Sequence, residues 1–349
     1  MQKINPARLE IPWLQSGVEC AITRGRSRYY REPPAPIGGG STITACSSRV
    51  YFYVVILVAA TLFFFYGSAQ AAEPLSPDGK VLNDKYHSIK TKLEKNQFGI
   101  PVYLESIEEI SSLYVDIYGI FEYSFEGIRD AFQVPANWCD IAILHTHTKA
   151  STCIEKVDQW HITLYNGLAS YQPPEDAFAI NFKFRVLPQQ SDYLHISLFA
   201  DEGPFFTKNH RFEFEVVPLD KRTSFVHFSY FYNYNRLGRM AIKAYFATIG
   251  RNKKGFSIVA KDKKGNPLYL GGVRGSVERN AVRYYFALQT YMDSLKLPSE
   301  QRFEQRINQW YDLTARYPIQ LYEMDKEDYL ANKRREYANQ IALQSKSAR

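Results

Sequence analysis

The sequence has few cysteines and no motif that names a reaction. Four cysteines in 349 residues exclude a disulfide-dense scaffold, and none of them belongs to a close C-x-x-C pair. The chain also lacks an H-E-x-x-H zinc motif, and the glycines of residues 271–275 (GGVRG) do not have the G-x-G-x-x-G spacing of a phosphate loop. No block of like charges indicates a disordered polyelectrolyte. The sequence therefore predicts no cofactor.

Aromatic residues are abundant by contrast. The chain has 26 Tyr and 23 Phe, and 45% of its residues are hydrophobic. This composition is sufficient for one large domain or two small ones. It predicts an aromatic core or an aromatic-lined cavity.

The longest apolar run lies near the N-terminus. Residues 50–66 (VYFYVVILVAATLFFFY) carry no charge, Arg49 precedes them, and an A-x-A site ending at Ala71 follows. This order is typical of a secretory signal, which predicts export to a periplasmic or extracellular location. The run is long for a signal and short for a spanning helix, so a membrane anchor over 49–72 is the alternative. Residues 1–48, which are rich in Pro, Gly and Ser around PPAPIGGGST, are expected to be a disordered tail or to follow from a translation start that is assigned too far upstream.

Removal of residues 1–71 would leave a mildly basic protein. The remaining chain has 36 basic and 33 acidic residues, so its net charge is +3 rather than the +7 of the whole sequence. Such a small excess does not favour nucleic acid as a partner. A membrane surface remains a candidate partner.

The two cysteines that would survive cleavage bracket an unusual segment, NWCDIAILHTHTKASTC (137–153). In an oxidising compartment, Cys139 and Cys153 are expected to form a disulfide, which in the chain-entropy model contributes about 3 kcal/mol for a loop of this size. Two buried free thiols are the alternative. Between them, residues 141–144 predict a buried strand that places His145 and His147 on one face.

Two histidines on one strand face suggest metal or acid–base chemistry. A catalytic zinc needs a third ligand, and the other predicted strands offer His161, His195 and His227. Because no fixed spacing supports such a set, no metal site is predicted. Acid–base catalysis by His227 or by the His145/His147 pair, oriented by Asp140 or Asp192, remains an enzymatic alternative.

Periodicity and turn residues divide the rest of the chain into short elements. Strands are predicted in the region 101–123 and at 160–165, 178–186, 193–199, 211–217 and 223–234, with a hairpin at 255–260 and 267–270. Helices are predicted at 83–96, 124–132, 237–249, 277–295, 299–317 and 325–343, with a turn at 133–138. In the strand 223–234 both faces are apolar, which indicates a strand that is buried on both sides or lines a cavity.

Two segments and this order of elements resemble the START-like helix-grip superfamily. The segments are YSFEGIRDAFQVPANW (123–138) and YLGGVRGSVERNAVRYYFALQTYM (269–292), and the likeness extends over about residues 110–295. It implies an α+β fold in which a curved antiparallel sheet grips a long C-terminal amphipathic helix. The implied organisation is a leading helix and linker (73–109), the helix-grip domain (110–297) and a C-terminal helical extension (298–349).

Such a fold would enclose an aromatic-lined space for a hydrophobic or lipid-like ligand. The candidate ligand-binding residues are His195, His227, Phe228, Tyr230, Phe231, Tyr232, Tyr284, Leu288 and Tyr291. Arg279 and Arg283, one turn apart and off the apolar stripe of the helix, are candidates to hold a phosphate or carboxylate at its mouth. The third interpretation is an envelope interaction protein that uses the basic residues 333–335 against lipid or a partner.

Overall fold

The computed structural model describes residues 79–187, 192–247 and 250–347. The expected tail and the expected signal or anchor lie outside this part of the chain, so both remain predictions. None of the described helices combines the length and the hydrophobicity that a membrane span requires.

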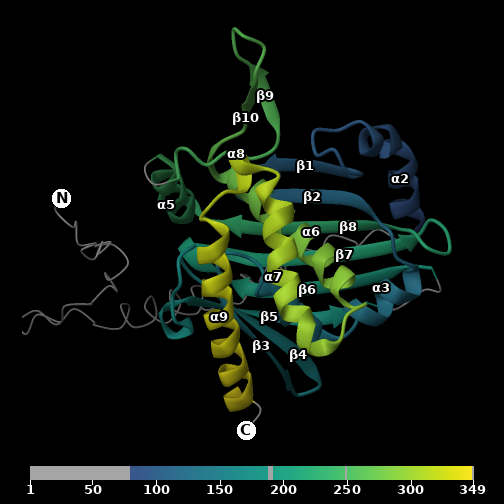
Figure 1. Ribbon diagram of the computed structural model, residues 1–349. Coiled ribbons are helices and arrows are strands. Elements are labelled where there is room, and N and C mark those ends of the chain that lie inside the picture. Colours follow the sequence, from purple (N-terminus) through teal and green to yellow (C-terminus); the bar gives the residue numbers. More distant parts are fainter. Residues whose placement is uncertain (1–78, 188–191, 248–249, 348–349) are drawn as a thin grey trace, which may run out of the picture. The chain divides into compact units, whose positions relative to one another are not determined.

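The described residues form an α+β unit (Figure 1). Its strands are β1 (Val102–Glu108), β2 (Ser112–Phe121), β3 (Thr148–Lys156), β4 (Gln159–Asn166), β5 (Phe178–Val186), β6 (Leu194–Glu202), β7 (Thr207–Pro218), β8 (Ser224–Tyr234), β9 (Ile258–Lys261) and β10 (Pro267–Tyr269). Its α-helices are α2 (Gly79–Glu94), α3 (Phe125–Phe132), α4 (Pro135–Ala142), α5 (Arg236–Ala247), α6 (Gly272–Ser294), α7 (Ser299–Ala315), α8 (Pro318–Leu321) and α9 (Lys326–Ser347). Two short 3-10 helices, η1 (Pro174–Asp176) and η2 (Pro204–Phe206), lie in turns.

Eight strands form one antiparallel sheet in the order β1-β2-β8-β7-β6-β5-β4-β3. Within this sheet all sequential strands pair with each other except β2 and β3, which lie apart because β8 pairs with both β2 and β7. Strands β9 and β10 form a separate hairpin. The predicted antiparallel meander is therefore confirmed.

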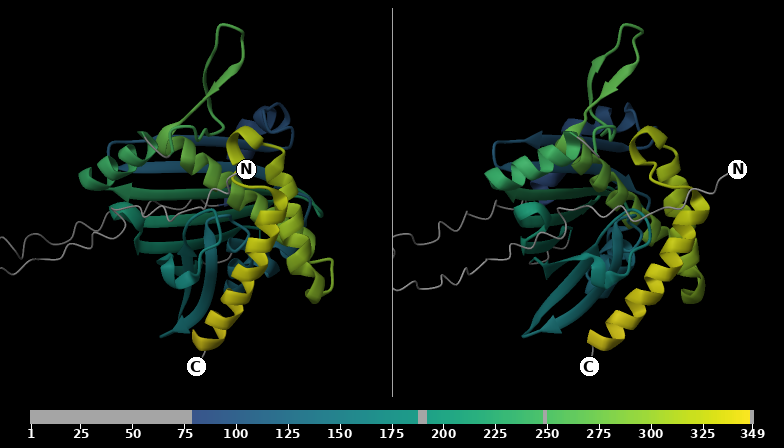
Figure 2. Two further views of the ribbon diagram at one scale, coloured as in Figure 1. Left: turned by 60° about the vertical axis from the view of Figure 1, so that its left-hand side comes forward. Right: turned by 90° about the vertical axis from the view of Figure 1, so that its left-hand side faces the viewer.

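The long helix α6 packs on one face of the curved sheet, here called the inner face (Figure 2). Gly119 of β2 permits this contact, because a Cβ at that position would lie 1.9 Å from the Tyr285 hydroxyl oxygen of α6. Helix α7 packs on α6. The predicted fold class, a sheet that grips a long helix followed by further helices, is confirmed.

The opposite face, the outer face, has a smaller core of its own. Helix α2 buries Leu82, Ile89 and Leu93 against Tyr118 and Phe225 of the sheet. The strand β8 is therefore covered on both sides, which explains its two apolar faces.

Helix α9 covers the edge of the sheet that β3 forms. The Gln340 Oε1 atom accepts the backbone N–H of Ser151 at 2.8 Å, and the Gln344 amide bonds both the N–H and the C=O of Cys153 at 2.8 Å. These side chains occupy backbone groups that an edge strand would otherwise present to another chain.

The prediction of a strand at 141–144 is wrong, and so is the prediction of a turn at 133–138. Residues 135–142 form helix α4, which buries Trp138, Ile141 and Ala142, and the strand β3 begins only at Thr148. Pro135 in the first turn suits a helix start, because its missing N–H would have no intrahelical partner there. A four-residue apolar run fits a strand and a buried helix equally well by periodicity.

Candidate functional site

The inner face carries a small apolar cavity between the sheet, α4 and α6. Its volume is about 20 Å³, and its walls are Trp138, Ile141, Ala142, Ile162, Leu164, Leu198, Phe212, Phe228, Tyr284 and Leu288. The resemblance implies an aromatic-lined space at this place that is large enough for a lipid-like ligand. The structure has it nearly filled, because the rings of Phe212, Phe228 and Tyr284 pack on each other with centroids 5.3–6.2 Å apart.

Three aromatic side chains in contact with each other connect this cavity with the carboxylate of Glu323. The ring of Tyr284 stacks on His145 at 4.8 Å between centroids, and His145 lies 5.7 Å from the ring of His147. The His147 Nε2 atom is 3.9 Å from a carboxylate oxygen of Glu323. The two histidines of the 137–153 segment therefore stand between the apolar cavity and Glu323.

Three basic side chains surround Glu323, and we call this set (Lys253, Arg279, Arg283 and Glu323) the basic cluster. The Arg279 guanidinium donates to the carboxylate, Arg283 Nη2 donates at 2.9 Å and Lys253 Nζ at 3.4 Å. Burial opposes ionisation of Glu323, but the neighbouring His147 and basic residues hold the pKa of its carboxyl well below the usual value. The cluster thus has three basic groups for one carboxylate.

The basic cluster is buried at one end and open at the other. Arg279 and Arg283 are almost fully buried, whereas the side chains of Lys253 and His147 are 26% and 28% exposed. Among the described residues, the Arg283 Nε atom is buried without a hydrogen-bond partner. The two arginines lie on the same side of α6 as α8 and Glu323, so they are not part of a solvated face.

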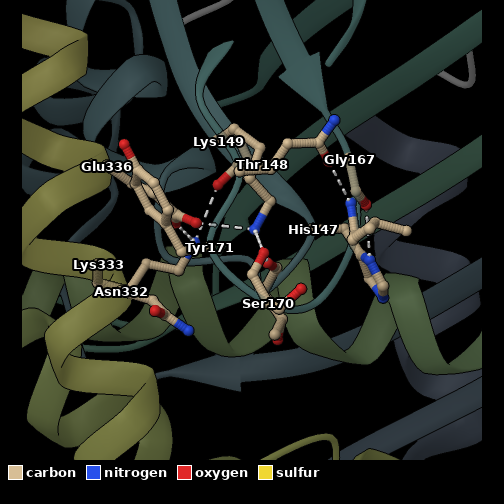
Figure 3. Close-up of polar contacts among 12 residues, drawn as sticks. His147, Thr148, Lys149, Gly167, Ser170, Tyr171, Asn332, Lys333 and Glu336 are labelled. Carbon is tan, nitrogen blue, oxygen red and sulfur yellow. Dashed lines mark hydrogen bonds and ion pairs between the residues drawn. The ribbon is translucent and has the colours of Figure 1, made fainter. Parts of the chain in front are cut away.

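The turn that carries His145 and His147 is held by two buried lysines (Figure 3). Lys333 donates to the carbonyl oxygens of His145 at 2.7 Å and Thr148 at 2.9 Å, and Lys149 donates to that of Thr146 at 2.9 Å. Both ammonium groups also bind Glu336, at 2.7 and 2.8 Å. Side chains of both α9 and β3 thus hold the backbone of the turn that carries the two histidines.

Both histidines of this turn favour the neutral form. Burial lowers the pKa of His145, and burial also lowers the pKa of His147 despite the opposing effect of Glu323. The His147 Nδ1 atom lies 3.0 Å from the Gly167 carbonyl oxygen, which selects the tautomer with its proton on Nδ1.

The structure divides the predicted ligand residues between the two faces of the sheet. Phe228, Tyr230 and Tyr232 of β8 face inwards, and the Tyr230 hydroxyl lies 2.7 Å from His210 Nδ1. Tyr284 and Leu288 line the cavity from α6. Tyr291 lies further along α6, under the guanidinium of Arg306 at 4.2 Å, and does not line the cavity.

The three other predicted residues, His195, His227 and Phe231, lie on the outer face and cannot contact a ligand in the cavity. Phe231 packs on Tyr114 at 4.6 Å between centroids. His195 Nε2 is 2.6 Å from Glu213. His227 lies between two carboxylates, 2.6 Å from Glu215 and 2.9 Å from Asp116.

The paired carboxylates keep His227 charged. Burial favours its neutral form, but the hydrogen bonds to Asp116 and Glu215 outweigh burial and raise the pKa of His227 to about 9. Among the described residues, no group of three or more His, Cys, Asp or Glu side chains has the arrangement of a metal site.

Cys139 and Cys153 are free thiols in the structure, and both are buried. They are hydrogen-bonded to each other: this bond raises the pKa of Cys139 and lowers that of Cys153. The predicted disulfide is therefore not formed in the structure, although the two residues are in contact.

Of the basic residues 333–335, Lys333 is buried, whereas Arg334 and Arg335 are exposed and contact other side chains of the fold. Lys333 is buried with Glu336, Arg334 pairs with Glu304 at 2.8 Å, and the Arg335 guanidinium stacks on Tyr171 at 3.6 Å. Lys333 is therefore not available to a partner, and the interpretation that residues 333–335 contact lipid stays a prediction for the exposed Arg334 and Arg335.

Sequence reasoning missed Lys253, Glu323, His210 and Phe212. Alternation along β7, with His210, Phe212 and Phe214 on the inner face, would have revealed the last two. No local pattern marks Lys253 and Glu323, which are 70 residues apart in the chain.

A second hollow, an open groove of about 490 Å³, lies between the start of α4 and the ends of β4 and β5. Its walls include Pro135, Trp160 and Phe184. It adjoins residues 188–191, which are not described, so the inner site is the better defined candidate.

Comparison with known proteins gives no family assignment. No family model and no curated protein match the chain. Among solved structures, norcoclaurine synthase from Thalictrum flavum is 11% identical, with a TM-score of 0.29 over 41% of this chain and 78% of that chain. Human StAR-related lipid transfer protein 5 is 9% identical, with a TM-score of 0.32 over 62% and 99%. A conserved protein from Geobacillus kaustophilus is 11% identical, with a TM-score of 0.31 over 53% and 95%. Values this low transfer neither ligand nor reaction to this chain.

Proposed function

We propose that the chain binds a hydrophobic small molecule or lipid that carries an acidic group. The observation that supports this most is the continuity between the apolar cavity and the basic cluster through Tyr284, His145 and His147. A ligand tail would lie against the rings of the inner face, and its anionic group would meet Lys253, Arg279 and Arg283.

The tail has to displace side chains to enter. A cavity of about 20 Å³ accommodates roughly one water molecule, so the described state is closed to any larger ligand. Burying apolar area contributes about 25 cal/mol per Å², which favours an apolar tail once the rings separate. The binding-competent state would then be a minor one that the ligand stabilises.

The acidic group of the ligand would interact with the positive charge of the basic cluster that Glu323 does not neutralise. Three basic groups surround this single carboxylate, and planar guanidinium groups bind carboxylate and phosphate oxygens in pairs. An anion near Lys253 and His147 would not need to displace Glu323, because both of these side chains are partly exposed. This chemistry supports a ligand with one anionic end.

Two fluorescent probes that differ by one anionic group test the proposal. We expect 1-anilinonaphthalene-8-sulfonate to bind at least about tenfold more tightly than the uncharged N-phenyl-1-naphthylamine, because charge-assisted hydrogen bonds are the stronger ones. Lys253→Met should reduce this preference, whereas Lys254→Met, the same change one residue on, should leave it unchanged. Equal binding of both probes, or equal effects of both variants, would contradict the role of the basic cluster.

A matched pair of cavity variants locates the apolar end. Leu288→Ala enlarges the inner cavity and should increase the affinity for both probes. Leu82→Ala removes the same atoms from the core under α2 and should lower stability without changing probe affinity. If neither variant, or both, changes probe binding, the tail does not occupy the inner face.

We also propose that the protein is exported and that Cys139 and Cys153 are then oxidised. The A-x-A site before Ala72 supports cleavage, and the contact between the two thiols supports their pairing without a large movement of α4 or β3. Peptide mapping without reduction, on protein from its native compartment, should show an N-terminus at Ala72 and a link between residues 139 and 153. An intact N-terminus with two alkylatable thiols would refute both parts.

A further inference from the structure

The segment between the last strand of the sheet and α6 concentrates positive charge. Residues 236–270 contain nine Lys and Arg and one acidic residue, Asp262, in a chain whose basic and acidic residues are otherwise nearly balanced. Two elements are built from this segment, helix α5 and the hairpin β9–β10.

The hairpin projects from the rest of the fold, as both views of Figure 2 show. Every residue of β9 is exposed, including Ile258 (49%) and Val259 (59%), and Leu268 of β10 is 47% exposed. The pairing of Leu268 with Ala260 and of Tyr269 with Ile258 puts these four side chains on one face of the hairpin, and Val259 adds an apolar side chain to the other face. An exposed two-stranded hairpin is only marginally stable by itself, so an apolar face of this kind favours a partner that buries it.

Charge accompanies this apolar face. Lys261, Lys263 and Lys264 are exposed at the end of the hairpin. The one acidic side chain, Asp262, is used within the turn, where it accepts the backbone N–H groups of Lys264 and Asn266 at 2.8 Å. The hairpin therefore presents lysines beside apolar side chains and no free carboxylate.

Helix α5 repeats the same combination. Arg236, Met240 and Lys243 are spaced by one turn each and are exposed, Met240 by 69%. Phe206 of η2, which packs beside α5, is 63% exposed. Basic and apolar side chains are again adjacent at the surface.

We propose that α5 and the hairpin β9–β10 form a docking surface for an anionic lipid bilayer. A bilayer interface buries apolar side chains and attracts lysines through its anionic head groups, at about 1 kcal/mol for each basic residue near the surface. Nucleic acid would satisfy the lysines but would leave Ile258, Val259 and Leu268 in water. An anionic lipid surface attracts the lysines and also buries the apolar side chains. The proposal does not depend on whether the inner cavity binds a ligand.

The hairpin adjoins the inner site through its base. Its base is joined to α6 because the Glu278 carboxylate accepts the N–H groups of Phe256 and Ser257 at 2.7 and 2.8 Å. Lys253, at the same base, belongs to the basic cluster. The docking surface and the basic cluster therefore share a short stretch of chain.

Hydrogen–deuterium exchange of the full chain tests the docking surface. With phosphatidylcholine vesicles that contain phosphatidylglycerol, we expect the amides of residues 257–270 to exchange at least about tenfold more slowly than with pure phosphatidylcholine, given the attraction of basic residues to anionic lipid. Raised salt should weaken this protection. The N-terminal segment with its basic residues and the apolar run at 50–66 is present in every sample, so charge variants are needed to assign the difference to the hairpin.

Two charge variants complete the test. Lys263→Glu/Lys264→Glu should abolish the protection, whereas Lys90→Glu/Lys95→Glu, the same charge change on exposed positions of α2 and the residue after it, should retain it. Equal protection by both lipids would overturn the proposal. So would protection by duplex DNA instead of vesicles, or protection that appears without lipid as the protein concentration rises, which would indicate a second copy of the chain.

Discussion

Replacing Glu336 by glutamine is expected to lower the free energy of unfolding by about 3–5 kcal/mol, because it leaves two buried ammonium groups without a counter-charge. The side chains of Glu336, Lys149 and Lys333 are 0–1% exposed, so water cannot compensate. The variant should also release the turn that carries His145 and His147, since both lysines bind its carbonyl oxygens. Urea denaturation of parent and variant measures the loss.

A lysine variant provides the control for this prediction. Lys333→Met removes one of two cations and leaves Lys149 and Glu336 as a balanced pair, so it should cost clearly less than Glu336→Gln. The cost of Glu336→Gln should also decrease towards pH 9. Burial already lowers the pKa of Lys333 to about 8, and without Glu336 the lysine gives up its proton more easily. If both variants lose the same free energy of unfolding, the loss comes mainly from altered packing and not from unpaired charge.

The second large effect concerns the outer face, where stability should fall as the pH rises from about 6.5 to 9. Against burial, Asp116 and Glu215 raise the pKa of His227 to about 9, so in this window the folded protein binds one proton more than the unfolded chain. The stabilisation is complete below the unfolded pKa of about 6.5 and is lost as the pH passes the folded value. The shift corresponds to about 3 kcal/mol.

The difference between the parent and His227→Gln isolates this contribution. Above pH 8 the neutralisation of Lys333 acts in the opposite direction, because its pKa is lowered and not raised, and it is common to both proteins. The parent should exceed the variant by about 3 kcal/mol at pH 6, and the two should converge near pH 9.5. His161→Gln, on an exposed imidazole of the same sheet, should follow the parent. A difference that stays constant with pH would mean that His227 does not titrate in this range.

The corrections to the sequence-based predictions have a common physical cause. Alternation along a strand assigns side chains to faces correctly, as it does in β8, but it does not say which face is the inner one. The sequence therefore groups His195 and His227 with Tyr230, although the two histidines lie on the opposite face of the sheet from Tyr230. The apolar run 141–144 has the same ambiguity, since a short hydrophobic segment fits a buried helix and a buried strand alike.

The sequence by itself determined the antiparallel meander, the long helix α6 and the concentration of aromatic side chains between them. These follow from periodicity and turn residues, which act over a few residues of chain. Only the tertiary structure decided that the interior is nearly filled, that Arg279 and Arg283 share Glu323 with Lys253, and that two lysines hold the histidine turn. These features depend on contacts between residues up to 188 positions apart. Packing in the folded state, which local propensity does not encode, brings such residues together.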